Sequence, residues 1–148
     1  MKYKQSQSGT SLFEVLVAIV VIGITLISLI SIVTHSISNS TFSKNRTRAA
    51  ALTTEAVEWL RSQRDNDWTT FSGYAASTPG NDYCLRDLTL DPMPCAQIEN
   101  IFTRTATLTT ISVNGQDAVE IHVVTIWNEQ DGIHESRATT TLTNWRLQ

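Results

Sequence analysis

The stretch that decides the fold begins Gly9-Thr-Ser-Leu-Phe-Glu-Val-Leu-Val-Ala-Ile19 and continues as an apolar run to Val33. From Val15 to Val33 there are 19 residues without a charge. As a helix they would span about 28 Å, close to the hydrocarbon thickness of a bilayer. Glu14 lies directly before this run. A carboxylate at the centre of a membrane costs roughly 2.5–3.5 kcal/mol. The stretch predicts a membrane-spanning helix whose acid needs an explanation.

The whole chain of 148 residues is long enough for one soluble domain and an appendage. Its net charge is −3, from 14 acidic and 11 basic residues, so no basic surface favours nucleic-acid binding. Hydrophobic residues make up 41% of the sequence, but the continuous apolar run lies within the first 33 positions. This asymmetry is typical of a single-pass membrane protein with a small soluble domain.

The run predicts a retained anchor more than a removable signal, because it ends in Ser-Ile-Val-Thr-His-Ser-Ile, a poor signal-peptidase site. Lys2 and Lys4 favour a cytoplasmic N-terminus, whereas Lys44, Arg46 and Arg48 follow the span within 15 residues. Charge alone therefore leaves the orientation open. Long domains translocate largely regardless of charge, so an extracytoplasmic C-terminal domain is permitted.

One explanation of Glu14 is purely structural. Ser11-Leu-Phe-Glu14 fits the capping box, in which the serine hydroxyl and the carboxylate each satisfy a backbone amide at a helix start. A capping box does not account for the short basic leader, Gly9 and the uninterrupted span that surround it.

In this register the segment resembles the prepilin cleavage and methylation motif, usually Gly-Phe-Thr-Leu-Ile-Glu-Val-Leu-Val-Ala. Proteins with this motif are type IV pilins, minor pilins and the pseudopilins of type II secretion. The resemblance implies cleavage between Gly9 and Thr10 by a prepilin peptidase, which also N-methylates the new terminus. Glu14 then falls at the fifth mature residue, where the family keeps its acid, and Gly23 falls on the family's recurrent helix glycine. The first mature residue is Thr10, where the family usually has Phe or Met.

The same resemblance implies a structural subunit and not an enzyme, with no cofactor. The expected location is the cytoplasmic membrane, N-terminus inside and C-terminal domain outside, followed by a surface or envelope filament. The partners implied are the prepilin peptidase, other pilin or pseudopilin subunits, the inner-membrane assembly platform and the lipid bilayer. In such a filament Glu14 would neutralise the terminal amine of a neighbouring subunit, because an isolated charge in a membrane is costlier than a pair. The alternative is a membrane-anchored extracytoplasmic binding module that does not polymerise.

Beyond the span we expect the helix to continue over residues 34–64. Eight of the twelve residues from Thr34 to Asn45 are Ser, Thr or Asn, so helix and flexible tether both stay open there. Further on, apolar residues recur at helical spacing and predict a face packed under a sheet. Those residues are Ala49, Leu52, Ala56 and Leu60.

Residues 65–100 are expected to form a connecting loop, pinned to the core by Trp68, Phe71 and Tyr74. Cys84 and Cys95 lie in this loop without the spacing of a zinc site. In an oxidising envelope a disulfide between them would stabilise the fold by about 3 kcal/mol. Two reduced, half-buried thiols are the alternative.

The last third, residues 101–148, predicts a three-stranded antiparallel meander, with strands at about 101–113, 118–127 and 134–145. Asn114-Gly115 and Asp131-Gly132 between them are strong hairpin signals. In the middle strand, alternate residues from Val119 to Trp127 share one face. Together with the helix of residues 10–33 and 34–64, behind a leader of residues 1–9, this gives an α+β, pilin-like architecture.

The sequence shows no constellation that predicts catalysis. His35, His122 and His134 are scattered and are expected to be solvated. Four acids surround the cysteine loop without the spacing of a calcium motif, so surface carboxylates are the default expectation. These are Asp82, Asp87, Asp91 and Glu99.

Overall fold

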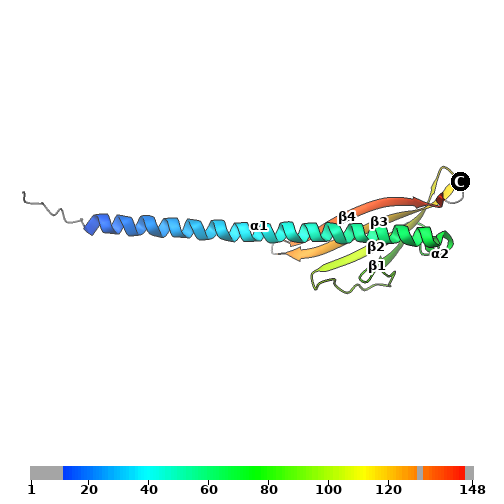
Figure 1. Ribbon diagram of the computed structural model, residues 1–148, viewed down its shortest axis with the longest axis horizontal. Helices are drawn as coiled ribbons and strands as arrows, with labels where there is room; N and C mark the ends of the chain where they lie inside the picture. The colour runs from blue at the N-terminus through cyan, green and yellow to red at the C-terminus, as the bar shows by residue number, and fades with distance from the viewer. Residues whose placement is uncertain (1–11, 130–131, 146–148) are drawn as a thin grey trace, which may run out of the picture. The chain divides into compact units, whose positions relative to one another are not determined.

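The computed structural model describes residues 12–129 and 132–145. The chain divides into two compact units, Met1–Thr41 and Phe42–Gln148. Helix α1, Leu12–Asn66, begins in the first unit and ends in the second (Figure 1). Residues 34–45, for which the sequence leaves helix and tether open, are helical throughout.

In the second unit α1 packs against an antiparallel sheet of four strands in the order β1-β2-β3-β4 (Figure 1). A short helix, α2, follows α1 directly. The elements after α1 are α2 Trp68–Ser72, β1 Asn81–Cys84, β2 Phe102–Val113, β3 Gln116–Glu129 and β4 Gly132–Thr143. The α+β class and the meander of the last three strands are confirmed.

The prediction of three strands is wrong, because β1 adds a fourth within the segment expected to be a loop. Its four residues pair with β2, from Asn81 opposite Leu108 to Cys84 opposite Thr105. Asn-Asp-Tyr-Cys lacks the β-branched residues that mark a strand, so its conformation comes from pairing with a longer neighbour. The segment 65–100 also contains α2, whose first turn is capped by Asp67.

The turn between β2 and β3 has the form that its dipeptide predicts. Val113 pairs with Gln116, so Asn114 and Gly115 form a two-residue loop. Both have positive φ, 52° and 79°, as a type I′ turn requires, and Asn and Gly tolerate this conformation best. In the second hairpin Glu129 pairs with Gly132, and Asp131 lies outside the described residues.

The core lies between α1 and one face of the sheet. The helix face predicted from apolar spacing is confirmed, since Ala49, Leu52, Ala56 and Leu60 are at most 3% exposed. The alternation in β3 is also confirmed: its residues at 119, 121, 123, 125 and 127 are buried, and Glu120 is exposed. Of the predicted loop anchors, Phe71 is 2% exposed and belongs to the core, whereas Tyr74 is 39% exposed.

Candidate functional site

The part of α1 in the first unit carries a continuous apolar surface. One window of the helix is long and apolar enough to cross a membrane, and none of that window is buried within the chain. Leu12 and Ile27, for example, are 80% and 71% exposed. Soluble monomers rarely expose contiguous apolar patches larger than a few hundred Å². The segment is therefore compatible with a membrane anchor.

Glu14 lies in the first turn of α1 and is exposed. It has no hydrogen bond or ion pair with any residue that the structure describes. A carboxylate near a helix N-terminus interacts favourably with the helix dipole. Ser11, the expected partner in a capping box, lies outside the described residues, as do Gly9 and Thr10.

Gly23 lies inside α1, and no other described part of the chain packs against it. A Cβ atom added there would meet no atom within 4 Å. Glycine in a helix interior costs up to about 1 kcal/mol relative to alanine. In membrane helices, glycine lets a neighbouring helix approach closely, so the surface at Gly23 is open to a contact with another chain.

The hydroxyl groups along the apolar segment are largely satisfied within the helix itself. Thr25 donates to the carbonyl of Ile22 at 2.8 Å, and Ser28 donates to that of Ile24 at 2.9 Å. Such bonds let Ser and Thr lie in hydrocarbon without an unpaired polar group. A charged Glu14 carboxylate therefore costs much more to place in a membrane than either of these hydroxyl groups.

Cys84 and Cys95 form a disulfide, with Cα atoms 5.3 Å apart. The four acids around the cysteine loop take separate partners. Asp82 accepts from Thr107, Asp91 from Thr89, and Glu99 from Arg48, while Asp87 pairs with Arg86. In the described part of the chain, no group of three or more metal-ligating side chains comes together.

His134 differs from the expectation of a solvated side chain. Its ring packs between Phe42 of α1 and Trp127 of β3, at centroid distances of 5.0 and 5.5 Å. Its Nε2 is buried and has no hydrogen-bond partner within residues 12–129 and 132–145. His134 lies on the face of β4 that packs toward α1. The sequence analysis placed it only after a turn and did not predict this position.

Replacing His134 with phenylalanine is expected to raise the free energy of unfolding by about 1 kcal/mol, because a buried nitrogen without a partner is removed while the aromatic packing stays. Urea unfolding of the full chain in detergent, followed by tryptophan fluorescence, measures the change. His122→Phe on the opposite face of the sheet is the matched control and should change little. A loss of stability at position 134 would mean that the nitrogen has a partner.

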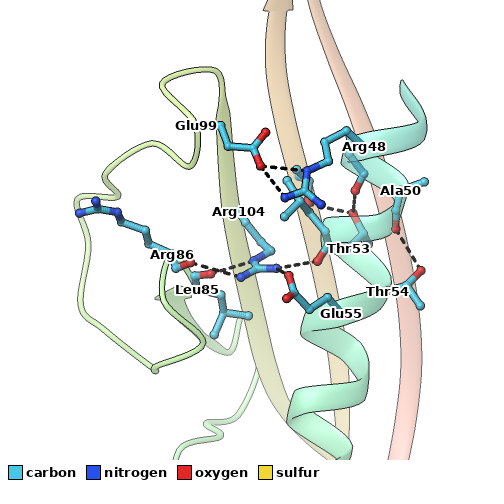
Figure 2. Close-up of polar contacts among 12 residues, drawn as sticks. Arg48, Ala50, Thr53, Thr54, Glu55, Leu85, Arg86, Glu99 and Arg104 are labelled. Atoms are coloured by element: carbon cyan, nitrogen blue, oxygen red, sulfur yellow. Dashed lines mark hydrogen bonds and ion pairs between the residues drawn. The ribbon is translucent and has the colours of Figure 1, made fainter. Parts of the chain in front are cut away.

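The residue that the sequence analysis missed is Arg104, which is 2% exposed and lies between α1 and the loop after β1 (Figure 2). Its Nε donates to the carbonyl of Leu85 at 2.7 Å, and Nη1 donates to the carbonyl of Leu52 and to Glu55, both at 2.8 Å. Nη2 donates to the carbonyl of Arg86 at 3.3 Å. Its signal in the sequence is its place in the inward series of β2, between Phe102 and Ala106.

A second arginine joins α1 to the same region from the surface. Arg48 pairs with Glu99, and its Nε lies 3.0 Å from the carboxylate (Figure 2). The hydrogen bond from Arg48 holds the pKa of Glu99 below its ordinary value, with a smaller contribution from the positive charges of Arg48 and Lys44. Both side chains are about half exposed, so solvent screens the pair.

The Arg48–Glu99 pair predicts a dependence of stability on pH. Because the pKa of Glu99 is lower in the folded state, its contribution is present above the ordinary value of 4.5 and is lost as the pH falls through the folded pKa. The measurement is the urea concentration at the midpoint of unfolding, recorded as the pH is lowered. This midpoint should fall less steeply with pH in Glu99→Gln than in the parent chain. Glu120→Gln, an exposed acid on β3, is the control and should leave the acid limb as in the parent chain. An unchanged acid limb in Glu99→Gln would contradict the prediction.

Of the residues singled out in the sequence, the structure describes Glu14 and Gly23 on the unburied part of α1, and Cys84 and Cys95 in the second unit. Glu14 and Gly23 lie on the same helix, and no other described part of the chain covers either of them. This arrangement can hold a chain in a membrane and offer a helix surface to a neighbour; it brings no titratable groups together for catalysis among the residues described. No family model, curated protein or solved structure matches the chain.

Proposed function

We propose that this chain is a minor pilin or pseudopilin, a structural subunit of a type IV pilus or of a related type II secretion filament. In this proposal a prepilin peptidase removes residues 1–9, and the N-terminal helix then enters a bundle of similar helices. The assembly platform of the inner membrane, other subunits and the bilayer are its partners. It has no enzymatic role of its own.

The observation that carries the proposal is the Glu14 carboxylate in the first turn of an unburied apolar helix, where no described residue pairs with it. Glu14 is followed by 19 residues without a charge, and Gly9 precedes it in the register of the prepilin motif. An acid at that depth becomes tolerable when an ammonium group from a neighbouring chain compensates it. The amine that cleavage would create at Thr10 is such a group.

The architecture of the second unit is consistent with the same proposal. A helix that continues from an apolar segment and packs its later part on an antiparallel sheet is pilin-like in plan. A plain membrane-anchored binding module would be compatible with the fold but would give no reason for Gly9, Glu14 and the span to keep this register.

The test is the intact mass of the chain extracted from the membrane of a bacterium that has a prepilin peptidase. We expect the mass of a chain that begins at Thr10, with or without one methyl group. The parent chain from a host without the peptidase should keep Met1. The Gly9→Val chain should keep Met1 even in the host that has the peptidase. Retention of residues 1–9 in the host with the peptidase would overturn the proposal and favour the binding module.

A further inference from the structure

Strand β4 forms one edge of the sheet in the second unit, and β1 forms the other (Figure 1). All twelve residues of β4 pair with β3, from Gly132 opposite Glu129 to Thr143 opposite Ala118. On the other side of β4 the sheet ends. An edge strand presents a row of backbone groups to which a further strand can bond.

The register shows which residues of β4 point their backbone groups away from the sheet. The amide of Leu85, directly after β1, donates to the carbonyl of Arg104, so the even-numbered residues of β2 bond toward β1. In an antiparallel sheet both backbone groups of a residue point to the same side, and the side alternates along each strand. With the observed pairings, the odd-numbered residues of β3 bond to β4, and the odd-numbered residues of β4 face outward. Those in the middle of the strand are Glu135, Arg137, Thr139 and Thr141.

The outward backbone groups of these four residues have no partner in the part of the chain that the structure describes. Neither their amides nor their carbonyls take part in a hydrogen bond with residues 12–129 or 132–145. Their side chains are exposed, on the face of the sheet away from α1. Glu135 and Arg137 pair with each other on that face. The free edge is therefore a row of unpaired donors and acceptors about 20 Å long.

The opposite edge of the sheet is closed by the chain itself. The amide of Cys84 in β1 donates to the carbonyl of Asp91 at 2.8 Å, and the amide of Asp91 donates back to Cys84 at 3.2 Å. The disulfide between Cys84 and Cys95 holds this segment beside β1. Exposed edges are commonly protected by short length, proline, lysine, a bulge or a covering loop. Strand β1 is short and covered, whereas β4 has twelve residues in unbroken register and contains neither proline nor lysine.

We propose that the free edge of β4 binds an extended strand of a different protein chain, which adds a fifth strand to the sheet. The backbone groups of β4 supply the hydrogen bonds, as in other cases of strand addition. Alternate side chains of the added strand would lie beside Ser136, Ala138 and Thr140, which are half-buried on the face toward α1. None of these three is charged, and a charge placed there would be desolvated without a partner. The partner strand should therefore carry small or apolar side chains on that face.

A second copy of this chain does not supply such a strand. Within its β1, only Asp82 offers free outward backbone groups, because those of Cys84 are bonded to Asp91. Two copies anchored in one membrane run in the same direction, so their β4 strands could meet only in parallel. The face covered by α1 in one copy would then continue into the uncovered face of the other, and the two would share no core. This leaves a non-identical chain as the partner.

This inference goes beyond the proposed function, because strand addition at β4 does not depend on processing at Gly9. Hydrogen exchange of the full chain tests it directly, in detergent and in membranes isolated from the bacterium that produces the chain. The amides of Thr139 and Thr141 should exchange at least about tenfold more slowly in the membranes, where the partner strand bonds them. The amide of Thr140, which points toward β3, is the internal control and should exchange slowly in both samples. Equal exchange of the Thr139 and Thr141 amides in the two samples would overturn the inference.

A photocrosslinker then identifies the chain that covers the edge. With benzoylphenylalanine in place of Thr139, we expect a crosslink between this chain and a different protein. Thr141→Pro removes an outward amide that the described fold does not use, so the chain should still fold. It should lower the crosslinking yield at least about tenfold, because a hydrogen bond is lost and the proline ring obstructs the partner. Thr141→Val keeps the amide and a side chain of similar size, and as the matched control it should leave the yield unchanged.

Two results of the crosslinking would overturn the inference. A product made of two copies of this chain would exclude a non-identical partner. Equal yields in Thr141→Pro and Thr141→Val would exclude strand addition, because the contact would then depend on side chains alone. Should Thr141→Pro fail to fold, as urea unfolding in detergent would show, the exchange comparison on the parent chain decides. The intact mass of the chain from the same membranes tests leader cleavage, and hence the proposed function, separately.

Discussion

A Glu14→Leu chain is expected to remain in the membrane and to be lost from filaments. Leucine makes the helix more apolar, so the variant should insert into the membrane as well as the parent chain does. In the proposed filament the variant would lack the charge that compensates a neighbour's terminal amine, and leaving one partner of a desolvated pair alone costs several kcal/mol. We expect at least about a hundredfold less of the variant than of the parent in purified filaments.

The measurement is quantitative mass spectrometry of sheared filaments and of the membrane fraction from the same cells. Ser28→Ala is the matched control, because the Ser28 hydroxyl already bonds to its own helix at Ile24 and should not be needed between chains. Glu14→Gln separates charge from shape. Equal incorporation of Glu14→Leu and the parent chain would leave the acid without its proposed role and favour an anchored binding module.

Arg104→Met is expected to lower the free energy of unfolding by about 2 kcal/mol. Methionine fills much of the volume, but the carbonyl of buried Leu85 loses the donor that Arg104 provides. The carbonyl of Arg86 and the carboxylate of Glu55 lose a partner too, but both residues are exposed and water can replace it. Unpaired buried polar groups cost about 1–3 kcal/mol each. Arg104→Lys should recover only part of the loss, because one ammonium cannot donate to both α1 and the loop after β1 as the planar guanidinium does.

Urea unfolding of the full chain in detergent provides the measurement, with the four tryptophans as the signal. Arg137→Met is the matched control, since Arg137 lies on the same sheet with 58% of its side chain exposed and pairs only at the surface with Glu135. Glu55→Gln should also cost little, because the Glu55 side chain is 53% exposed. If Arg104→Met and Arg137→Met lower the free energy of unfolding equally, the buried contacts of the Arg104 guanidinium do not contribute to stability.

The parts of the fold that could be predicted are those in which local pattern and tertiary packing agree. The helical spacing from Ala49 to Leu60 and the alternation from Val119 to Trp127 each repeat the period of the element they form. Asn114-Gly115 marks its turn because few other pairs tolerate positive φ at both positions. These signals lie within short windows and need no knowledge of distant partners.

The parts that could not be predicted depend on contacts between distant segments. Strand β1 has weak strand propensity and forms because β2 offers an edge. Arg104 is charged in an inward position, and its partners lie 18 to 52 residues away in the sequence. The ring of His134 packs against Phe42 of α1, which is far from it in the sequence. For the candidate site, Glu14 and Gly23 lie on α1 as expected, and their roles stay predictions, as does processing at Gly9 and Thr10.

Leu85 follows directly after Cys84, and Arg104 holds it from both sides: the amide of Leu85 donates to the carbonyl of Arg104 at 3.0 Å, while the arginine Nε donates back to Leu85. Two hydrogen bonds therefore hold the start of the cysteine loop independently of the disulfide. A polypeptide that arrives in its compartment with both thiols reduced can assemble its sheet first and be oxidised afterwards. The covalent link then locks in a geometry that the guanidinium has already set.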